Sequence, residues 1–255
     1  MRRLLVIGIG AGDPEHVTVQ AINALNEVDV FFVIDKGHET EELVRLRMEI
    51  CERYIREQTY RIVEIPDPPR DRTAPAYRTA VEQWRAQRAQ LWERAIADEL
   101  GEDGCGAFLV WGDPSLYDST LAVLDRILAR GSVAFEHEVV AGISSVQALT
   151  ARHRMPLNRV GGAVQITTGR RLAAEGFPDG VEEVVVLLDA DCSFRRLEHD
   201  GVEIHWGAYL GMDDEILVSG PLREVADEIV RVRREARERK GWIMDAYLLR
   251  RNVAD

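Results

Sequence analysis

The chain has 255 residues, of which 46% are hydrophobic and 30% charged, and its formal net charge is -12 at pH 7. This length allows one large buried core or two modest domains. The negative charge argues against a nucleic-acid-binding protein, because most of the surface would repel a phosphate backbone. No apolar run approaches the roughly 20 residues that cross a bilayer, so a membrane partner is not expected either.

The cysteines and histidines argue against both a disulfide framework and a metal site. Cys51, Cys105 and Cys192 are far apart, and no C-x-x-C spacing occurs. An odd, scattered set of cysteines is typical of a reducing compartment, so we expect a cytoplasmic protein. The six histidines show no metal-ligand spacing, and we therefore expect no metal.

The first part of the chain alternates short apolar runs with helical periodicity. The apolar runs predict five strands, at Leu4–Ile9, Val28–Ile34, Tyr60–Ile65, Phe108–Trp111 and Val133–Val140. Helical periodicity between them covers Val17–Asn26, Glu41–Tyr54 and Tyr77–Leu100. This alternation predicts a parallel sheet with flanking helices, which binds ligands at the carboxyl ends of its strands.

The pattern changes from about Leu157 onward. Five further strands are predicted at Val164–Thr168, Val184–Leu188, Ile204–Leu210, Ile216–Ser219 and Trp242–Leu249, with a long helix at Leu222–Arg239. The short connection Gly211–Asp214 is typical of a hairpin turn, which makes the second sheet mixed. The fold class is therefore α/β, with a five-stranded parallel sheet in residues 1–156 and a mixed five-stranded sheet in residues 157–255.

The first predicted strand runs into a glycine-rich loop, GIGAGDP, at residues 8–14. Glycine allows positive φ and lets a ligand approach the backbone closely. The pair Asp13-Pro14 predicts an N-cap and the first residue of a helix. A dinucleotide-binding loop would need a third glycine where Asp13 stands. Asp35, at the end of the second strand, could still act as a ribose-binding acid, so a dehydrogenase remains a weaker alternative.

Two more loops follow the fourth and fifth strands. The fourth ends at GDPSLYDS, residues 112–119, and the fifth leads into AGISS, residues 141–145. Ser144 with Gln147 fits a capping box at the start of a helix. Ser145 then lies near the same helix N-terminus, where a carboxylate could be held. Two Gly-Asp-Pro loops at one edge of one sheet predict a shared ligand site.

These three loops, in this order, resemble those of the tetrapyrrole methylases. That family's pattern is G-x-G-P-G-D-P, then G-D-P-x-x-Y, then P-G-[IV]-[ST]-[SA]. Ala11 and Ala141 stand where the family has proline. The resemblance extends over essentially the whole chain, with longer stretches such as VTVQAINALNEVDVFFVIDKG, GISSVQALTARHRMPLNRVG and WGAYLGMDDEILVSGPL.

The resemblance implies transfer of a methyl group from S-adenosylmethionine to a ring carbon of a tetrapyrrole (precorrin), with S-adenosylhomocysteine as product. It also implies a homodimer. The implied cofactor contacts fall on Gly10, Ala11, Trp111, Gly112, Asp113, Ser144, Ser145, Leu188, Tyr209 and Leu210. Periodicity alone would place the two leucines in an ordinary core.

The wider match implies that C1 of the precorrin loses an acetyl group as acetate and takes the methyl group. Acetate release needs a base that activates water. Asp35 is the first candidate, although it could equally be a solvent-facing turn residue, and Tyr117 is the second. The carboxylates of the substrate favour arginine partners. The candidates, each of which could be an ordinary surface residue, are Arg70, Arg72, Arg170 and Arg171.

Two other functions fit the same loops. One is a methylase of this family that acts at a different ring carbon, since the loop motifs do not distinguish ring positions. The other is a non-catalytic nucleotide-binding module, for which a paired Gly-Asp-Pro site would serve as well.

Overall fold

A computed structural model of the chain describes residues 1–35, 41–57, 59–69, 77–198 and 200–251. Contacts divide the chain into an N-terminal unit, Met1–Gly10 with Pro14–Ile143, and a C-terminal unit, Ala11–Asp13 with Ser144–Asp255. The sequence placed the division after residue 156. Helix α5 (Ser145–Arg152) contacts strands of the second sheet, and for this reason it belongs to the C-terminal unit.

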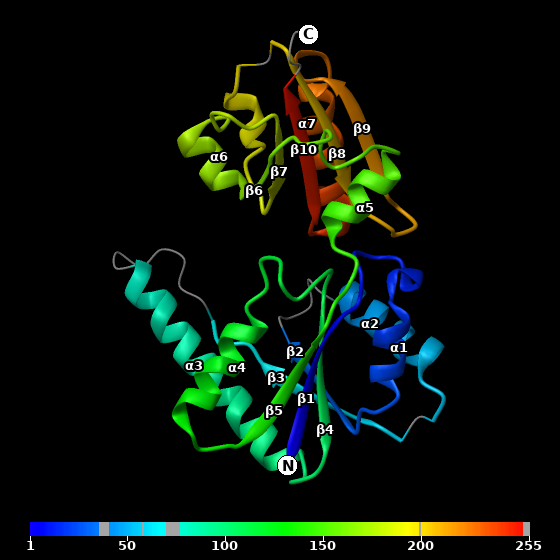
Figure 1. The fold of residues 1–255 in the computed structure, drawn as a ribbon, viewed down its shortest axis with the longest axis vertical. Coiled ribbons are helices and arrows are strands. Elements are labelled where there is room, and N and C mark those ends of the chain that lie inside the picture. The colour runs from blue at the N-terminus through cyan, green and yellow to red at the C-terminus, as the bar shows by residue number, and fades with distance from the viewer. Residues whose placement is uncertain (36–40, 58, 70–76, 199, 252–255) are drawn as a thin grey trace. The chain divides into compact units, whose positions relative to one another are not determined.

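The N-terminal unit contains a five-stranded sheet in the order β3-β2-β4-β1-β5, with every pairing parallel (Figure 1). Its strands are β1 (Arg2–Gly8), β2 (Val30–Asp35), β3 (Arg61–Pro66), β4 (Cys105–Val110) and β5 (Phe135–Val140). All five lie where the sequence predicts them, although β4 begins earlier than expected and ends before Trp111. The central position of β1 explains its continuous apolar run, because a parallel sheet is buried on both faces.

Helices cover both faces of this sheet. They are α1 (Val19–Leu25), α2 (Glu41–Tyr54), α3 (Tyr77–Glu99) and α4 (Thr120–Arg130). Side chains alternate along β1, so that Leu5 and Ile7 pack with α1 and α2, whereas Leu4 and Val6 pack with α3 and α4. The two sides of the sheet therefore have separate cores.

Neither Gly-Asp-Pro segment begins an α-helix, although the sequence predicts a helix start at Asp13-Pro14. After Asp13, residues Pro14–His16 form one 3-10 turn (η1). Helix α1 begins later because Thr18 supplies the cap, its side-chain oxygen accepting a hydrogen bond from the Ala21 N–H at 3.1 Å. After the second segment, α4 does not begin until Thr120.

The C-terminal unit contains a mixed sheet in the order β6-β7-β10-β8-β9. Its strands are β6 (Val164–Thr168), β7 (Glu183–Leu187), β8 (Val202–Ala208), β9 (Ile216–Pro221) and β10 (Asp245–Arg251). Strands β6 and β7 are parallel, and the other neighbours are antiparallel. The predicted hairpin between β8 and β9 and the predicted fold class of two α/β sheets are both confirmed.

One face of this second sheet packs against α6 (Gly169–Glu175), the short 3-10 helix η3 (Ser193–Arg196) and α7 (Leu222–Lys240). Trp206 and Tyr247 are fully buried in that core. Helix α5 contacts β8 and β10. None of the helices in the described parts of the chain is long and apolar enough to cross a membrane.

Helix α5 and strand β8 bring two histidines together. The ring centroids of His153, at the C-cap of α5, and His205 are 5.3 Å apart. His153 Nε2 lies 3.1 Å from the Trp206 carbonyl oxygen, whereas neither ring nitrogen of His205 has a hydrogen-bond partner among the described residues. Burial lowers the pKa of His205 to about 4, reinforced by His153 and Arg250 and opposed by Glu203. Burial lowers the pKa of His153 as well.

We therefore expect the free energy of unfolding to fall as the pH drops from about 6.5 towards 4. The unfolded chain takes up a proton near its ordinary histidine pKa, while the folded chain resists protonation until about pH 4. Between pH 7 and pH 5, His205 should contribute a loss of about 1–2 kcal/mol. Urea titrations of the parent and of His205→Gln would measure it. An identical pH dependence in both proteins would contradict the assignment.

Candidate cofactor and substrate site

The first two glycine loops meet through their backbones. The Gly112 N–H donates to the Gly10 carbonyl oxygen at 2.8 Å, and the Gly10 N–H donates to the Gly112 carbonyl oxygen at 3.3 Å. Strands β1 and β4 are parallel neighbours, so their following loops emerge at the same edge of the sheet. The sequence predicted this convergence from two Gly-Asp-Pro segments, and the structure confirms it.

The third loop packs against the same junction through Gly142. A Cβ atom on Gly142 would overlap the Gly112 carbonyl oxygen, and one on Gly8 would lie 2.6 Å from the Gly142 nitrogen. Gly10 has φ +84° and its Cβ would overlap the His16 side chain. These positions require glycine for the packing of the loops themselves, whether or not a ligand is bound.

Asp113 holds the second and third loops together. Its Oδ2 accepts a hydrogen bond from the Gly142 N–H at 2.9 Å, and its Oδ1 accepts from the Ser115 N–H at 2.9 Å and from the Ser115 hydroxyl. Burial raises the pKa of Asp113, but these hydrogen bonds outweigh it and lower the pKa below its ordinary value. Asp113 therefore links the second loop to the third.

Ser144 caps α5 as the sequence predicts, with a modified pattern of bonds. Its Oγ accepts from the Val146 N–H at 3.1 Å and donates to Gln147 Oε1. In a standard capping box the third residue bonds the backbone N–H of the cap instead. Ser144 is buried, and its hydroxyl group forms this cap. Ser145 is half-buried in the first turn of the helix.

Three predicted contacts lie at strand ends of the C-terminal unit. Leu188 follows β7 and is 68% exposed with φ +55°, so a core position is wrong for it. Leu210 is buried, and its carbonyl oxygen would overlap a Cβ on Gly12. Tyr209 is also buried, and its hydroxyl donates to the Trp242 carbonyl oxygen at 2.6 Å. Its hydroxyl therefore serves the structure of this unit.

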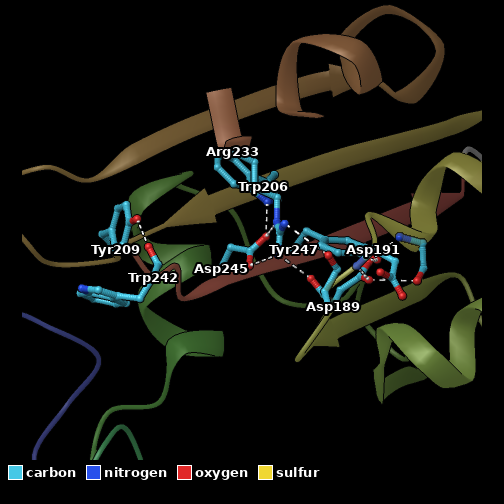
Figure 2. Close-up of polar contacts among 10 residues, drawn as sticks. Asp189, Asp191, Trp206, Tyr209, Arg233, Trp242, Asp245 and Tyr247 are labelled. Carbon is cyan, nitrogen blue, oxygen red and sulfur yellow. Dashed lines mark hydrogen bonds and ion pairs between the residues drawn. The ribbon is translucent and has the colours of Figure 1, made fainter. Parts of the chain in front are cut away.

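A buried polar network fixes the turn that carries Leu188 (Figure 2). Asp189 accepts hydrogen bonds from the Tyr247 hydroxyl and the Ser193 N–H, each at 2.6 Å. Arg233 Nη2 donates to the Asp189 carbonyl oxygen at 2.8 Å, and its Nε pairs with Asp245 at 2.9 Å. The sequence pattern singles out none of the residues in this network. Only the pairing of β7 with β10 and the packing of α7 bring them together.

The two candidate bases lie at the carboxyl edge of the first sheet. Asp35 is the last residue of β2 and is exposed, and its carbonyl oxygen accepts from the Asp67 N–H at 3.1 Å. Tyr117 lies in the second loop, is 48% exposed and has φ +53°. Both are accessible to a ligand.

Only two of the four predicted arginines lie among the described residues. Arg70 and Arg72 lie outside the described residues. Arg170 and Arg171 are exposed on α6, where the Arg171 Nε pairs with Glu175 at 2.8 Å, as on an ordinary helix surface. Sequence analysis missed Arg47, whose guanidinium carbon lies 5.9 Å from the centre of the Trp111 ring. Arg47 is one of several charged residues on α2, and its spacing in the sequence does not distinguish it from the others.

Comparison with known proteins identifies the class. The family model of the tetrapyrrole (corrin/porphyrin) methylases matches residues 3–226. The chain therefore belongs to the tetrapyrrole methylases, a family of methyltransferases. In the described part of the chain, no group of three or more His, Cys, Asp or Glu side chains could hold a metal ion.

Individual relatives narrow the class further. The chain is 53% identical to the precorrin-6A synthase (deacetylating) of Sinorhizobium sp, with 99% of this chain and 97% of that one covered. It resembles the crystal structure of a cobalamin synthesis related protein, CobF, from Corynebacterium diphtheriae, with a TM-score of 0.85 and 34% identity over 99% and 100% of the two chains. The uroporphyrin-III C-methyl transferase of Thermus thermophilus, solved with S-adenosylhomocysteine, shares the fold, with a TM-score of 0.57 at 19% identity over 97% and 91%.

The junction of the three loops gives a prediction for stability. Gly142→Ala places a methyl group against two backbone segments that have no room for it, so the free energy of unfolding should fall by at least about 1–3 kcal/mol. Gly101→Ala is the matched control, because a Cβ there has nothing within 4 Å and its φ is not positive. Chemical denaturation of both variants measures the difference. Equal stability would show that the loops are not packed in this way.

Proposed function

We propose that the chain is an S-adenosylmethionine-dependent C-methyltransferase that converts precorrin-5 to precorrin-6A, methylating C1 and releasing acetate. The observation that carries this proposal is 53% identity to a deacetylating precorrin-6A synthase over nearly the full length of both chains. A precorrin-2 C(20)-methyltransferase of Sinorhizobium sp is only 26% identical over 68% of the chain. The difference favours the deacetylating reaction over methylation at another ring carbon.

The residues present fit this cofactor. At the first sheet, Gly10 and Gly112 present backbone rather than side chains, which allows close approach of a ligand. In the C-terminal unit, Leu188 exposes an apolar side chain at a strand end, suited to a flat aromatic base. We assign cofactor binding to the residues implied by the family resemblance, Gly10, Ala11, Trp111, Gly112, Asp113, Ser144, Ser145, Leu188, Tyr209 and Leu210.

The proposed reaction changes two bonds at one ring carbon. S-adenosylmethionine supplies the methyl group and its own sulfonium leaving group. Water adds to the acetyl carbonyl carbon and loses one proton to a base, the bond from that carbon to C1 breaks, and acetic acid leaves and ionises to acetate. The electron pair that remains on C1 forms the new bond to the methyl carbon. The protein therefore has to align the reactants, exclude bulk water and remove one proton.

We assign removal of that proton to Asp35, with Tyr117 as the second candidate. Asp35 ends β2 at the carboxyl edge of the sheet, which is where ligands bind in open parallel sheets. Arg70, Arg72, Arg170 and Arg171 stay candidates for the carboxylates of the substrate. The exposure of Arg170 and Arg171 leaves them accessible.

We also propose that the enzyme is a cytoplasmic homodimer whose partners are small molecules, without nucleic acid or membrane. All three cysteines are free and buried, which suits a reducing compartment. The dimer is implied by the family resemblance, and light scattering on the purified protein would test it.

The chain should bind S-adenosylhomocysteine and S-adenosylmethionine, because its three loops resemble those of the family in sequence and meet at one backbone junction. Isothermal titration calorimetry with each compound, and with NAD as control, measures this. Binding of NAD without binding of either adenosyl compound would refute the proposed function.

Asp35→Asn should abolish acetate release and methylation while leaving the affinity for S-adenosylhomocysteine unchanged. The amide keeps the shape of the carboxylate but cannot accept the proton of water. General base catalysis typically contributes about 10²–10⁴ in rate. Single-turnover experiments that follow acetate and methylated product together provide the measurement. Acetate release at the parent rate would move water activation to another group, and Tyr117→Phe would then be tested.

A further inference from the structure

Strands β2 and β4 separate towards their carboxyl ends. Their pairing comprises Val30 with Gly106 and Phe31 with Ala107, although β2 continues to Asp35 and β4 to Val110. Strand β2 leads to α2 on one face of the sheet, and β4 leads to α4 on the opposite face. Adjacent strands whose connections leave to opposite faces mark the place where open α/β sheets bind ligands.

The side chain of Arg47 reaches this place from α2. Its Nε donates to the Leu109 carbonyl oxygen at 3.4 Å, on the part of β4 that β2 does not pair. Its Nη1 donates to the Leu43 carbonyl oxygen, also at 3.4 Å, and the guanidinium faces the Trp111 ring. Arg47 thus contacts both the end of β4 and the start of the second loop.

The charge of Arg47 is poorly compensated. A guanidinium has five N–H donors, and two of those of Arg47 have a partner among the described residues, both in long bonds to neutral carbonyl groups. No carboxylate lies within ion-pair distance of it among the described side chains. Burial lowers the pKa of Arg47, and the attraction of Asp118 opposes this only in part. Arg47 is half-buried, so its positive charge is partly removed from water without a described carboxylate to pair it, and this costs free energy.

The contacts of Arg88, a buried arginine in the same unit, provide a comparison with those of Arg47. Its Nε lies 3.0 Å from Asp67 Oδ1, and its Nη1 donates to Ser119 Oγ at 2.8 Å. Its guanidinium also lies 5.0 Å from the ring centres of both Trp84 and Trp92. Arg88 therefore has a carboxylate within ion-pair distance, whereas Arg47 has none among the described side chains.

We propose that Arg47 binds a carboxylate of the anionic substrate at the diverging ends of β2 and β4. A planar guanidinium can hold a carboxylate through two parallel hydrogen bonds, which Lys cannot reproduce. The assignment rests on the proposed function and names a specific contact within it. It also provides the local positive charge that a chain of net charge -12 needs to capture an anion.

The test compares Arg47→Gln and Arg47→Lys with the control Arg45→Gln, an exposed arginine on the same helix. The KM for precorrin-5 should rise by about ten- to a hundredfold in Arg47→Gln, the range expected for hydrogen bonds to a charged group. Its KM should also depend less on salt concentration, while the Kd for S-adenosylhomocysteine stays at the parent value. Arg47→Lys should recover part of the loss, and Arg45→Gln should behave like the parent.

Two results would overturn the assignment. One is an unchanged KM in Arg47→Gln. The other is a loss of cofactor affinity and thermal stability in proportion to the rise in KM, which would show that Arg47 only supports the fold. Failure of the proposed function itself would appear in the parent, as absence of both S-adenosylhomocysteine binding and precorrin-5 turnover, and would remove both proposals together.

Discussion

The candidate site depends on the close backbone contact between the loops that follow β1, β4 and β5. Gly10 and Gly112 exchange backbone hydrogen bonds, and Gly142 packs directly against Gly112. Asp113 then uses its carboxylate to hold Gly142 in place. A side chain larger than hydrogen at these glycines would force the loops apart, and the loops would no longer form one continuous backbone surface at the edge of the sheet. The spacing of the loops thus follows from main-chain packing, which also sets the positions of the residues proposed to bind the cofactor.

In the C-terminal unit, buried charged side chains rather than close backbone contacts fix the local geometry. Arg233 is paired with Asp245 and also bonds the Asp189 carbonyl oxygen, while Tyr247 donates to the Asp189 carboxylate. Burial raises the pKa of the Tyr247 hydroxyl, so it remains a donor at any physiological pH. Because these groups satisfy one another, the turn after β7 can hold Leu188 in a left-handed conformation with its side chain exposed. Paired buried charges here maintain a local geometry that the backbone alone would disfavour.

The sequence predicted the elements and the loops more successfully than the partners of individual side chains. Apolar runs and glycine punctuation located all ten strands, since these signals arise within a few residues of each other. The helix start predicted at Asp13-Pro14 is a single 3-10 turn, and the α-helix begins only after Thr18, whose side chain caps it. The role of Asp113 as a link to Gly142 depends on a residue 29 positions away. Long-range contacts of this kind leave no periodic pattern in the chain.

By itself, the sequence determined the class of protein, through three glycine loops placed after apolar strands and a resemblance that runs along the whole chain. It also determined that the loops share one sheet edge, because parallel strands end on the same side. Only the tertiary structure decided which charged residues are compensated. Arg88 and Arg47 look alike in sequence, yet among the described residues one pairs with a carboxylate, whereas the other contacts two carbonyl oxygens and an aromatic ring. The reason is physical: compensation depends on distances of a few ångströms between distant segments, and those distances exist only after the chain has folded.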